Sequence, residues 1–224
     1  MAHEDLTTQD VLAAYKIGLF PMADSIHAKT ISWYSPEMRG QLPIAGLHVP
    51  ERLRRSVLQA PYDIKINTAF ADVIDGCAAL TAERRESWIN QDIKDIFTTL
   101  HKEGHAHSVE SWQDGALAGG LCGAGIGGAF MGESMFSRAR DASKIALVHL
   151  CARLWHLNFT VLDTQFINEH IAQFGAHEIA RDDYLRKLSI SLKINTSFTN
   201  PVPAEDILID AFFTMQQQRK EQNS

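Results

Sequence analysis

The hydrophobic and polar positions of the chain follow two periods, which predict a mixture of helices and strands. Apolar residues three and four positions apart mark amphipathic helices, and strict alternation marks half-buried strands. This pattern predicts helices over residues 8–17, 50–58, 69–79, 90–102, 143–157, 167–174, 182–192 and from about 204 into the tail. It predicts strands over residues 31–35, 62–67, 106–112, 116–122, 128–132, 159–164 and about 177–179. Interleaved elements of both kinds indicate an α+β fold with a mixed sheet.

Residues that favour turns and helix ends refine these boundaries. Pro50 is expected in the first turn of its helix, and Thr68 is expected to cap the next one. Asp114 and Gly115 are a strong hairpin signal, and the glycines within 123–127 predict a second turn. We expect a small N-terminal domain over residues 1–38, a larger domain over 39–192, and a tail with a helix over 193–224.

The composition fits a globular protein of the cytoplasm. With 45% hydrophobic and 21% charged residues, the 224-residue chain can fill a core. Its net charge of −6 argues against non-specific coating of nucleic acid, although local basic patches remain compatible with it. The three cysteines are widely spaced and form no zinc motif. The acidic N-terminus and the lack of a long apolar run predict neither a signal peptide nor a membrane span.

The candidate site is centred on the run Gly132-Glu133-Ser134-Met135-Phe136-Ser137, which reads as a polar turn before the helix that starts near 143. Asp163 and Gln165 end the following buried strand. The N–H groups in the first turn of a helix have no partner within it and can receive an anion. We therefore expect Glu133, Asp163 and Gln165 to meet beside a helix N-terminus.

Each of these polar residues has two interpretations. Asp163 and Gln165 lie two apart on a strand and point to one face, where they can relay a proton during acyl transfer. The strand alone slightly favours a structural Asp163 that caps a turn or pairs with an arginine, because a buried carboxylate is costly unless bonded. Glu133 is either an ordinary strand-end acid or a ligand for a cationic group of a substrate.

The neighbouring apolar and basic residues are equally open. Met135, Leu147, Leu150, Cys151 and Leu154 form a helical stripe that is usually core but can also line a slot for an unbranched or γ-branched side chain. Two clusters can contact RNA or can simply be solvated or packed. The first consists of Arg138, Arg140 and Lys144, and the second of Arg84, Arg85 and Trp88.

Metal and dinucleotide sites are not expected. His101, His105 and His107 are separated by a helix-breaking Gly104, and no carboxylate or cysteine completes a metal-ligand spacing. The glycines near 125 lie in a hairpin rather than before a long helix, as a dinucleotide loop requires.

Several motifs are specific to one family. In order they are Gly18-Leu-Phe-Pro21, Phe70-Ala-Asp-Val-Ile-Asp-Gly-Cys-Ala78, Gly104-His-Ala-His-Ser-Val-Glu110, Phe130-Met-Gly-Glu-Ser-Met-Phe-Ser137, Ala142-Ser-Lys144 and Leu162-Asp-Thr-Gln165. Over roughly residues 14–188 the chain resembles the leucyl/phenylalanyl-tRNA–protein transferases. The resemblance implies a small N-terminal domain and a larger domain with the acetyltransferase-like (GNAT) fold.

The resemblance also implies an activity. It is the transfer of Leu, Phe and less often Met from aminoacyl-tRNA to the α-amino group of proteins that begin with Lys or Arg, in the bacterial N-end rule pathway. No metal or cofactor is implied, because the aminoacyl ester is already activated. We expect a cytoplasmic, monomeric enzyme that does not engage membranes.

The residues that match the family motifs have roles that the resemblance implies. Asp163 and Gln165 are expected to form the hydrogen-bond relay, and Glu133 to place the polar groups of the substrate. The predicted substrate-binding residues are Trp88 and Phe130 for the terminal adenosine, Met135, Ser137 and Leu147 for the side-chain pocket, and Asn168. The predicted phosphate-binding residues are Arg84, Arg85, Arg138, Arg140 and Lys144.

The chain departs from the family at three positions. Met22 stands where many members have Trp, and Phe97 and Cys122 where many have Tyr. Two other functions remain as alternatives. A CoA-dependent N-acetyltransferase is disfavoured because no glycine-containing pyrophosphate loop precedes the central helix, and a non-catalytic adaptor for basic N-termini would leave peptides unmodified.

Overall fold

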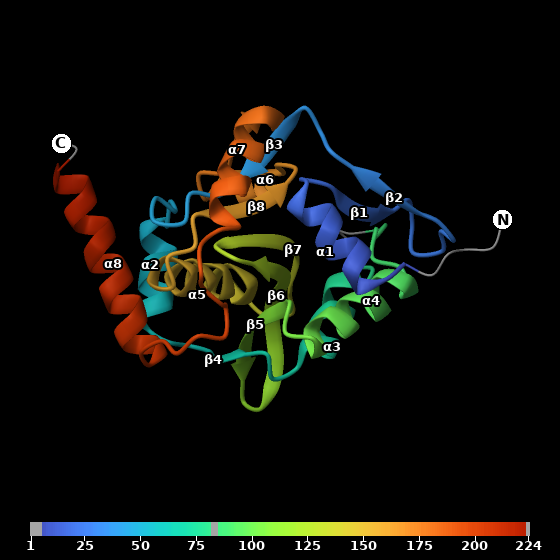
Figure 1. Cartoon of the computed structure of the whole chain (residues 1–224). Coiled ribbons are helices and arrows are strands. Elements are labelled where there is room, and N and C mark those ends of the chain that lie inside the picture. Colours follow the sequence, from blue (N-terminus) through green and yellow to red (C-terminus); the bar gives the residue numbers. More distant parts are fainter. Residues whose placement is uncertain (1–5, 82–84, 223–224) are drawn as a thin grey trace.

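A seven-stranded sheet forms the centre of the computed structural model, which describes residues 6–81 and 85–222 (Figure 1). Its strands are β3 (Met38–Gln41), β4 (Asp63–Ile66), β5 (Ala106–Gln113), β6 (Ala116–Ile126), β7 (Ala129–Ser137), β8 (Val161–Gln165) and β9 (His177–Ala180). They are arranged in the order β4-β5-β6-β7-β8-β3-β9, and only the β7–β8 pair is parallel. The sheet is therefore mixed, as the sequence predicts.

Helices cover both faces of this sheet. They are α1 (Thr8–Lys16), α2 (Glu51–Leu58), α3 (Phe70–Ala78), α4 (Gln91–Lys102), α5 (Ala142–His156), α6 (Glu169–Ala172), α7 (Arg181–Ser191) and α8 (Glu205–Gln222). One apolar cluster joins α5 to α2, α8 and one face of the sheet, and a second joins α1, α3, α4 and α7 to the other. The predicted α+β class is confirmed. Among the described helices, none has both the length and the apolar character needed to cross a membrane.

The N-terminal segment forms a separate unit around a two-stranded sheet. Strands β1 (Phe20–Ala23) and β2 (Ile31–Tyr34) pair only with each other, and the chain enters the large sheet at Met38. The hydrophobic pattern does not predict β1, to which Met22 and Ala23 belong. Helix α1 begins at Thr8, and its N-cap Thr7 forms a capping box with Asp10.

The glycine-rich region differs most from the prediction. Asp114 and Gly115 do form the β5–β6 turn, both with positive φ (51° and 77°). The glycines through 125, however, lie inside β6, and the next turn is at Gly127, where φ is +54°. Gly123 is required within the strand because a Cβ there would collide with the Met131 carbonyl and the Phe130 ring.

Two local predictions fail for tertiary reasons. The run 132–137 is not a turn but the second half of β7. Thr68 does not cap α3, because its hydroxyl donates to the Glu110 carboxylate, which also accepts the Ala69 N–H at 2.8 Å. In both cases a partner distant in sequence replaces the local interaction.

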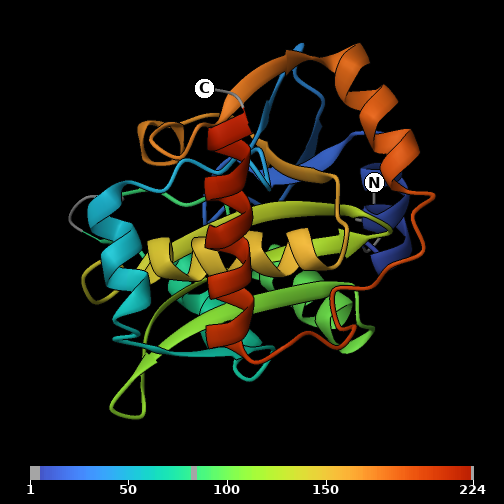
Figure 2. The ribbon, with the colours of Figure 1, turned by 90° about the vertical axis from the view of Figure 1, so that its left-hand side faces the viewer.

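The tail helix α8 is part of the core. It crosses in front of α5 (Figure 2), and its Leu208, Ile209, Phe212 and Phe213 are buried. The Phe212 ring lies 5.9 Å from that of Trp155 on α5, centroid to centroid. The helix that the sequence predicts from about residue 204 spans Glu205–Gln222.

We therefore expect Phe212→Ala to destabilise the whole protein. Loss of a fully buried phenylalanine costs about 3–5 kcal/mol, which corresponds to a melting temperature lower by roughly 10 °C for a chain of this size. Differential scanning calorimetry would measure the shift. The matched control is Ile207→Ala on the same helix, where the side chain is 59% exposed and the melting temperature should hardly change. Equal shifts in the two variants would contradict the assignment of α8 to the core.

Candidate active site

A β-bulge in β7 sets the position of Glu133. Across the β6–β7 pair, Cys122 faces Ser134 and Gly123 faces Gly132, so Glu133 has no partner residue on β6. Such an extra residue bends its strand and redirects a side chain. On its other side β7 pairs with β8 only as far as Met131. Beyond that residue the two parallel strands are no longer joined, and a cleft opens.

The cleft has a volume of about 1200 Å³ and lies between the second half of β7, the start of α5 and the small N-terminal sheet. One part of its wall is apolar and consists of Leu42, Leu121, Met135, Leu147, Leu150 and Leu162. Another part is acidic and consists of Asp24, Glu86, Glu133 and Asp141. The cleft thus combines an apolar slot with several carboxylates.

Glu133 is held by a residue from the N-terminal domain. The Tyr15 hydroxyl on α1 donates to its Oε1 at 2.6 Å. Burial raises the pKa of Glu133 to about 8, even though the Tyr15 hydrogen bond and the charge of Arg39 both favour the ionised form. The Asp163 carboxylate adds to the increase. Glu133 can therefore hold or release a proton near neutral pH.

Asp163 forms the arginine ion pair that the strand pattern favours. Its Oδ1 and Oδ2 accept hydrogen bonds from Nε and Nη2 of Arg39, at 2.9 and 2.7 Å. Oδ2 also accepts the Tyr184 hydroxyl at 2.8 Å, and Oδ1 accepts the Gln165 N–H at 2.9 Å. Asp163 is 0% exposed and does not line the cleft. The Asp163 carboxylate is thus a buried hydrogen-bond acceptor that joins Arg39, Tyr184 and Gln165, rather than an acceptor at the surface.

Gln165 lies between the Asp163 carboxylate and Glu133. With its amide nitrogen toward Glu133, the Nε2–Oε1 distance is 3.5 Å. With the amide reversed, the nitrogen donates to the carbonyl oxygens of Gly132 and Thr164 at 3.0 and 3.1 Å. We favour the reversed orientation because it makes two shorter bonds. The amide oxygen then faces Glu133, which suits a protonated carboxyl group.

The other predicted site residues divide into three groups. Trp88, Met135 and Leu147 line the cleft, as do Ser137 and Asn168. Ser137 and Asn168 also cap helices, since Ser137 Oγ accepts the Ser143 N–H at 2.9 Å and Asn168 Oδ1 accepts the Ile171 N–H at 3.0 Å. Phe130 is the exception. It is 0% exposed and packs against Phe198, so its ring does not reach the cleft.

The basic residues lie around the start of α5. Arg140 and Lys144 line the cleft. Both form ion pairs with Asp141, with Arg140 Nε 3.7 Å from Oδ2 and Lys144 Nζ 3.4 Å from Oδ1. Arg138 lies over the Phe136 ring and does not line the cleft. Arg85 is exposed, and Arg84 lies outside the described residues. Asp141 and the Ser137 cap therefore occupy part of the anion site expected at this helix end.

Sequence reasoning missed Tyr15, Arg39 and Tyr184. Tyr15 reads as one apolar position of α1, and Tyr184 as one of α7. Arg39 stands beside the expected domain boundary, where a charged residue is unremarkable. Only the contacts across the chain separate these residues from ordinary core and surface positions.

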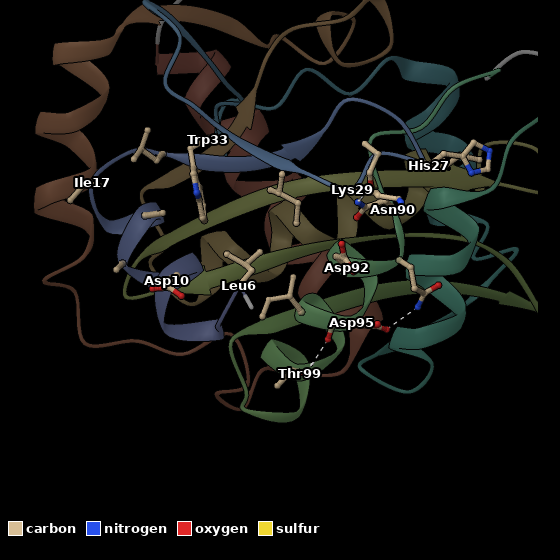
Figure 3. Close-up of a pocket in the computed structure, with 18 residues that line it drawn as sticks. Leu6, Asp10, Ile17, His27, Lys29, Trp33, Asn90, Asp92, Asp95 and Thr99 are labelled. Carbon is tan, nitrogen blue, oxygen red and sulfur yellow. Dashed lines mark hydrogen bonds between the residues drawn. The ribbon is translucent and has the colours of Figure 1, made fainter. Parts of the chain in front are cut away.

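A second cavity of about 1230 Å³ lies on the other side of the small sheet (Figure 3). Trp33, Ile17 and Leu6 line it together with acidic residues, among them Asp10 and Asp95. None of the predicted site residues that the structure describes lines this cavity. Within the described part of the chain, no group of three or more His, Cys, Asp or Glu side chains is arranged to bind a metal.

The shifted pKa of Glu133 predicts a pH-dependent stability. The folded state binds this proton up to about pH 8, whereas the unfolded chain releases it near 4.5. Glu133 therefore lowers the stability progressively between pH 4.5 and 8. Glu133→Gln should leave the melting temperature unchanged near pH 4.5 and raise it near pH 9, by on the order of 1 kcal/mol or roughly 2–4 °C for this half-buried group. Glu86→Gln, at an exposed acid of the same cleft, is the control, and a pH-independent gain in Glu133→Gln would contradict the assignment.

Comparison with known proteins identifies the family. A family model described as leucyl/phenylalanyl-tRNA protein transferase matches residues 41–189, and a model of its N-terminal domain matches residues 4–37. The leucyl/phenylalanyl-tRNA–protein transferase of Caulobacter vibrioides (strain NA1000 / CB15N) is 50% identical over 186 residues, which cover 83% of this chain and 86% of the relative. The protein of the same name from Rhodopseudomonas palustris (strain TIE-1) is 49% identical over 197 residues, 88% of each chain. That from Paramagnetospirillum magneticum is 51% identical over 187 residues, 84% of this chain and 90% of the relative. The chain belongs to the leucyl/phenylalanyl-tRNA protein transferase family.

Proposed function

We propose that this enzyme transfers Leu or Phe, and less often Met, from aminoacyl-tRNA to the N-terminal α-amino group of proteins that begin with Lys or Arg. This is the reaction of the bacterial N-end rule pathway, and we place it in the cytoplasm, catalysed by a monomer without a cofactor. The observation that carries the proposal is the cleft, where an apolar slot adjoins Glu133 in a member of this family. The larger domain would have the acetyltransferase-like fold, with the boundaries 1–38, 39–192 and 193–224.

The apolar wall of the cleft suits the transferred side chain. Met135, Leu147 and Leu162 present flexible or γ-branched groups, against which Leu, Phe or Met can pack. A narrow slot disfavours a side chain branched at the β-carbon. Because one misplaced methylene costs about 1–3 kcal/mol, discrimination among apolar amino acids is good but not absolute.

The acidic wall suits the acceptor. An N-terminal Lys or Arg carries a positive side chain, and Asp24 and Glu86 supply the opposite charge on the same cleft. An acceptor that begins with a neutral residue lacks this attraction. The preference for basic N-termini thus follows from the charge of the cleft.

The reaction joins the two substrates directly. The neutral amine attacks the ester carbonyl carbon, a C–N bond forms, the C–O bond to the terminal ribose breaks, and the amine proton ends on the released ribose hydroxyl. Glu133, ionised in part near neutral pH, accepts the proton from the amine. The amide oxygen of the reversed Gln165 then accepts a hydrogen bond from the protonated carboxyl group. Because the ester is already activated, positioning of the two substrates supplies much of the acceleration.

The tRNA end would approach from the side of Trp88. Its half-buried indole lines the cleft and can stack on the terminal adenosine, while Ser137 and Asn168 offer polar groups at the rim. The phosphates would meet Arg140 and Lys144, which line the cleft. Arg138 and Arg85 stay further candidates, as does Arg84, which lies outside the described residues. Met22 and Cys122, two of the departures from the family pattern, line the same cleft, whereas Phe97 lies in the core.

Mass spectrometry of a short peptide tests the proposed reaction. A peptide with N-terminal Lys or Arg, incubated with leucyl-tRNA and the protein, should gain one leucine residue. The gain should vanish when the tRNA is digested with RNase or when the peptide begins with Ala. An unchanged mass despite peptide binding would instead support an adaptor, and an acetyl group gained from acetyl-CoA would support an acetyltransferase.

Substitution of Trp88 tests the placement of the adenosine. Stacking on one base contributes about 1–3 kcal/mol, so Trp88→Ala should raise the KM for leucyl-tRNA roughly 5- to 150-fold and change kcat less. Steady-state kinetics with a fixed acceptor peptide measure both constants. Trp33→Ala removes a 39%-exposed tryptophan from the separate cavity of Figure 3 and should leave the KM as it is. A wild-type KM in Trp88→Ala would refute this contact.

A further inference from the structure

We propose that Arg39 is a positioning residue for the transfer reaction: through Asp163 it fixes the Gln165 amide beside Glu133. This inference rests on the proposed function for its kinetic consequences. Its structural basis is separate and lies in the contacts of the arginine.

Each of the three nitrogens of the Arg39 guanidinium donates a hydrogen bond inside the protein. Two of its nitrogens bind Asp163, and Nη1 donates to the Gly18 carbonyl at 2.9 Å. Its guanidinium lies 4.5 Å from the ring centroids of both Phe20 and Tyr184. The side chain is 1% exposed, in a position where the solvation of a charge is lost. Because a well-packed apolar pair is often as stable as a buried ion pair, stability alone does not account for this arrangement.

Arg39 is connected to the site through the hydrogen bonds at the end of β8. Asp163 Oδ1, which accepts the Arg39 Nε–H, also accepts the backbone N–H of Gln165. Gln165 has a φ of +56°, a left-handed conformation that is unfavourable for a residue with a side chain. The turn formed by Asp163 and Gln165 directs the Gln165 amide toward Gly132 and Glu133. Without a fixed carboxylate, the residue would be free to leave this conformation.

Both carboxylate oxygens of Asp163 are occupied by partners within the protein. The two oxygens receive two hydrogen bonds from Arg39, one from Gln165 and one from Tyr184. A carboxylate so occupied and entirely buried cannot take a proton from an amine in the cleft. Asp163 therefore acts with Arg39 in positioning. Of the three residues Glu133 lines the cleft, and the buried Gln165 lies against Glu133.

Arg39 also links this turn to the N-terminal domain. Its contacts with Gly18 and Phe20 hold the segment that follows α1, and α1 carries the Tyr15 hydroxyl that binds Glu133. One guanidinium thus ties both partners of Glu133, namely Gln165 on β8 and Tyr15 on α1. A shift of Arg39 would alter both contacts together.

Arg39→Lys is the central test, because it keeps the positive charge and loses the bidentate pairing with the Asp163 carboxylate. In the folded variant we expect kcat to fall roughly 10- to 100-fold, with the KM values for leucyl-tRNA and peptide within twofold of wild type. The matched control is Arg153→Lys. Arg153 is also buried, lies 5.0 Å from the Phe198 ring and donates to main-chain carbonyls, but it does not line the cleft. Its kcat should stay within twofold.

NMR provides a readout that does not depend on activity. The side-chain amide signals of Gln165 and the titration of ¹³C-labelled Glu133 should both shift in Arg39→Lys and stay unchanged in Arg153→Lys. Unaltered signals, or a wild-type kcat in the folded variant, would overturn the inference. If wild-type protein transfers no amino acid, the proposed function fails, and the NMR result alone decides the role of Arg39.

Tyr184→Phe keeps the inference testable should Arg39→Lys not fold. This change removes only the hydroxyl that donates to Asp163, so the Gln165 signals should shift in the same direction by a smaller amount. A folded Tyr184→Phe protein with unaltered Gln165 and Glu133 signals would overturn the role assigned to the carboxylate.

Discussion

The separation of β7 from β8 is the constraint on which the site depends. Two parallel strands in the middle of a sheet normally share hydrogen bonds along their length, but here the pairing ends at Met131 and Asp163. The bulge at Glu133 turns the rest of β7 away, and a cleft replaces the missing pairing. The backbone groups freed at this point need other partners, and the side chains of Asp163 and Gln165 supply some of them.

The cleft then acquires its chemistry from several distant parts of the chain. Helix α5 contributes Leu147 and residues of its first turn to the cleft wall. The small N-terminal sheet forms the opposite wall. Glu133 lies where burial outweighs the favourable contacts to Tyr15 and Arg39, which keeps its pKa near 8. An acid balanced in this way can exchange a proton with an amine, whereas the nearby Asp163, paired with Arg39, supports the geometry.

Much of the fold follows from the sequence, because the periodic elements are long and their ends are well marked. Helices α4 and α5 and the β5–β6 hairpin lie close to where hydrophobic spacing, Asn90 and the Asp114-Gly115 turn place them. The order of the predicted elements leads to the expectation that Glu133, Asp163 and Gln165 meet, and Gln165 does contact the other two. The errors fall where a distant partner overrides a local preference. Thr68 binds Glu110 instead of capping its helix, and the polar run at 132–137 pairs with β6 as a strand.

By itself the sequence determined the α+β class, most of the elements and the family, since these depend on periodicity and on contiguous motifs. Only the tertiary structure decided how the site residues are used. It placed Phe130 in the core, made Asp163 the buried partner of Arg39, and brought Tyr15 across from α1 to Glu133. The physical reason is that burial and charge pairing depend on residues more than 100 positions apart. No pattern along a single chain encodes such contacts directly.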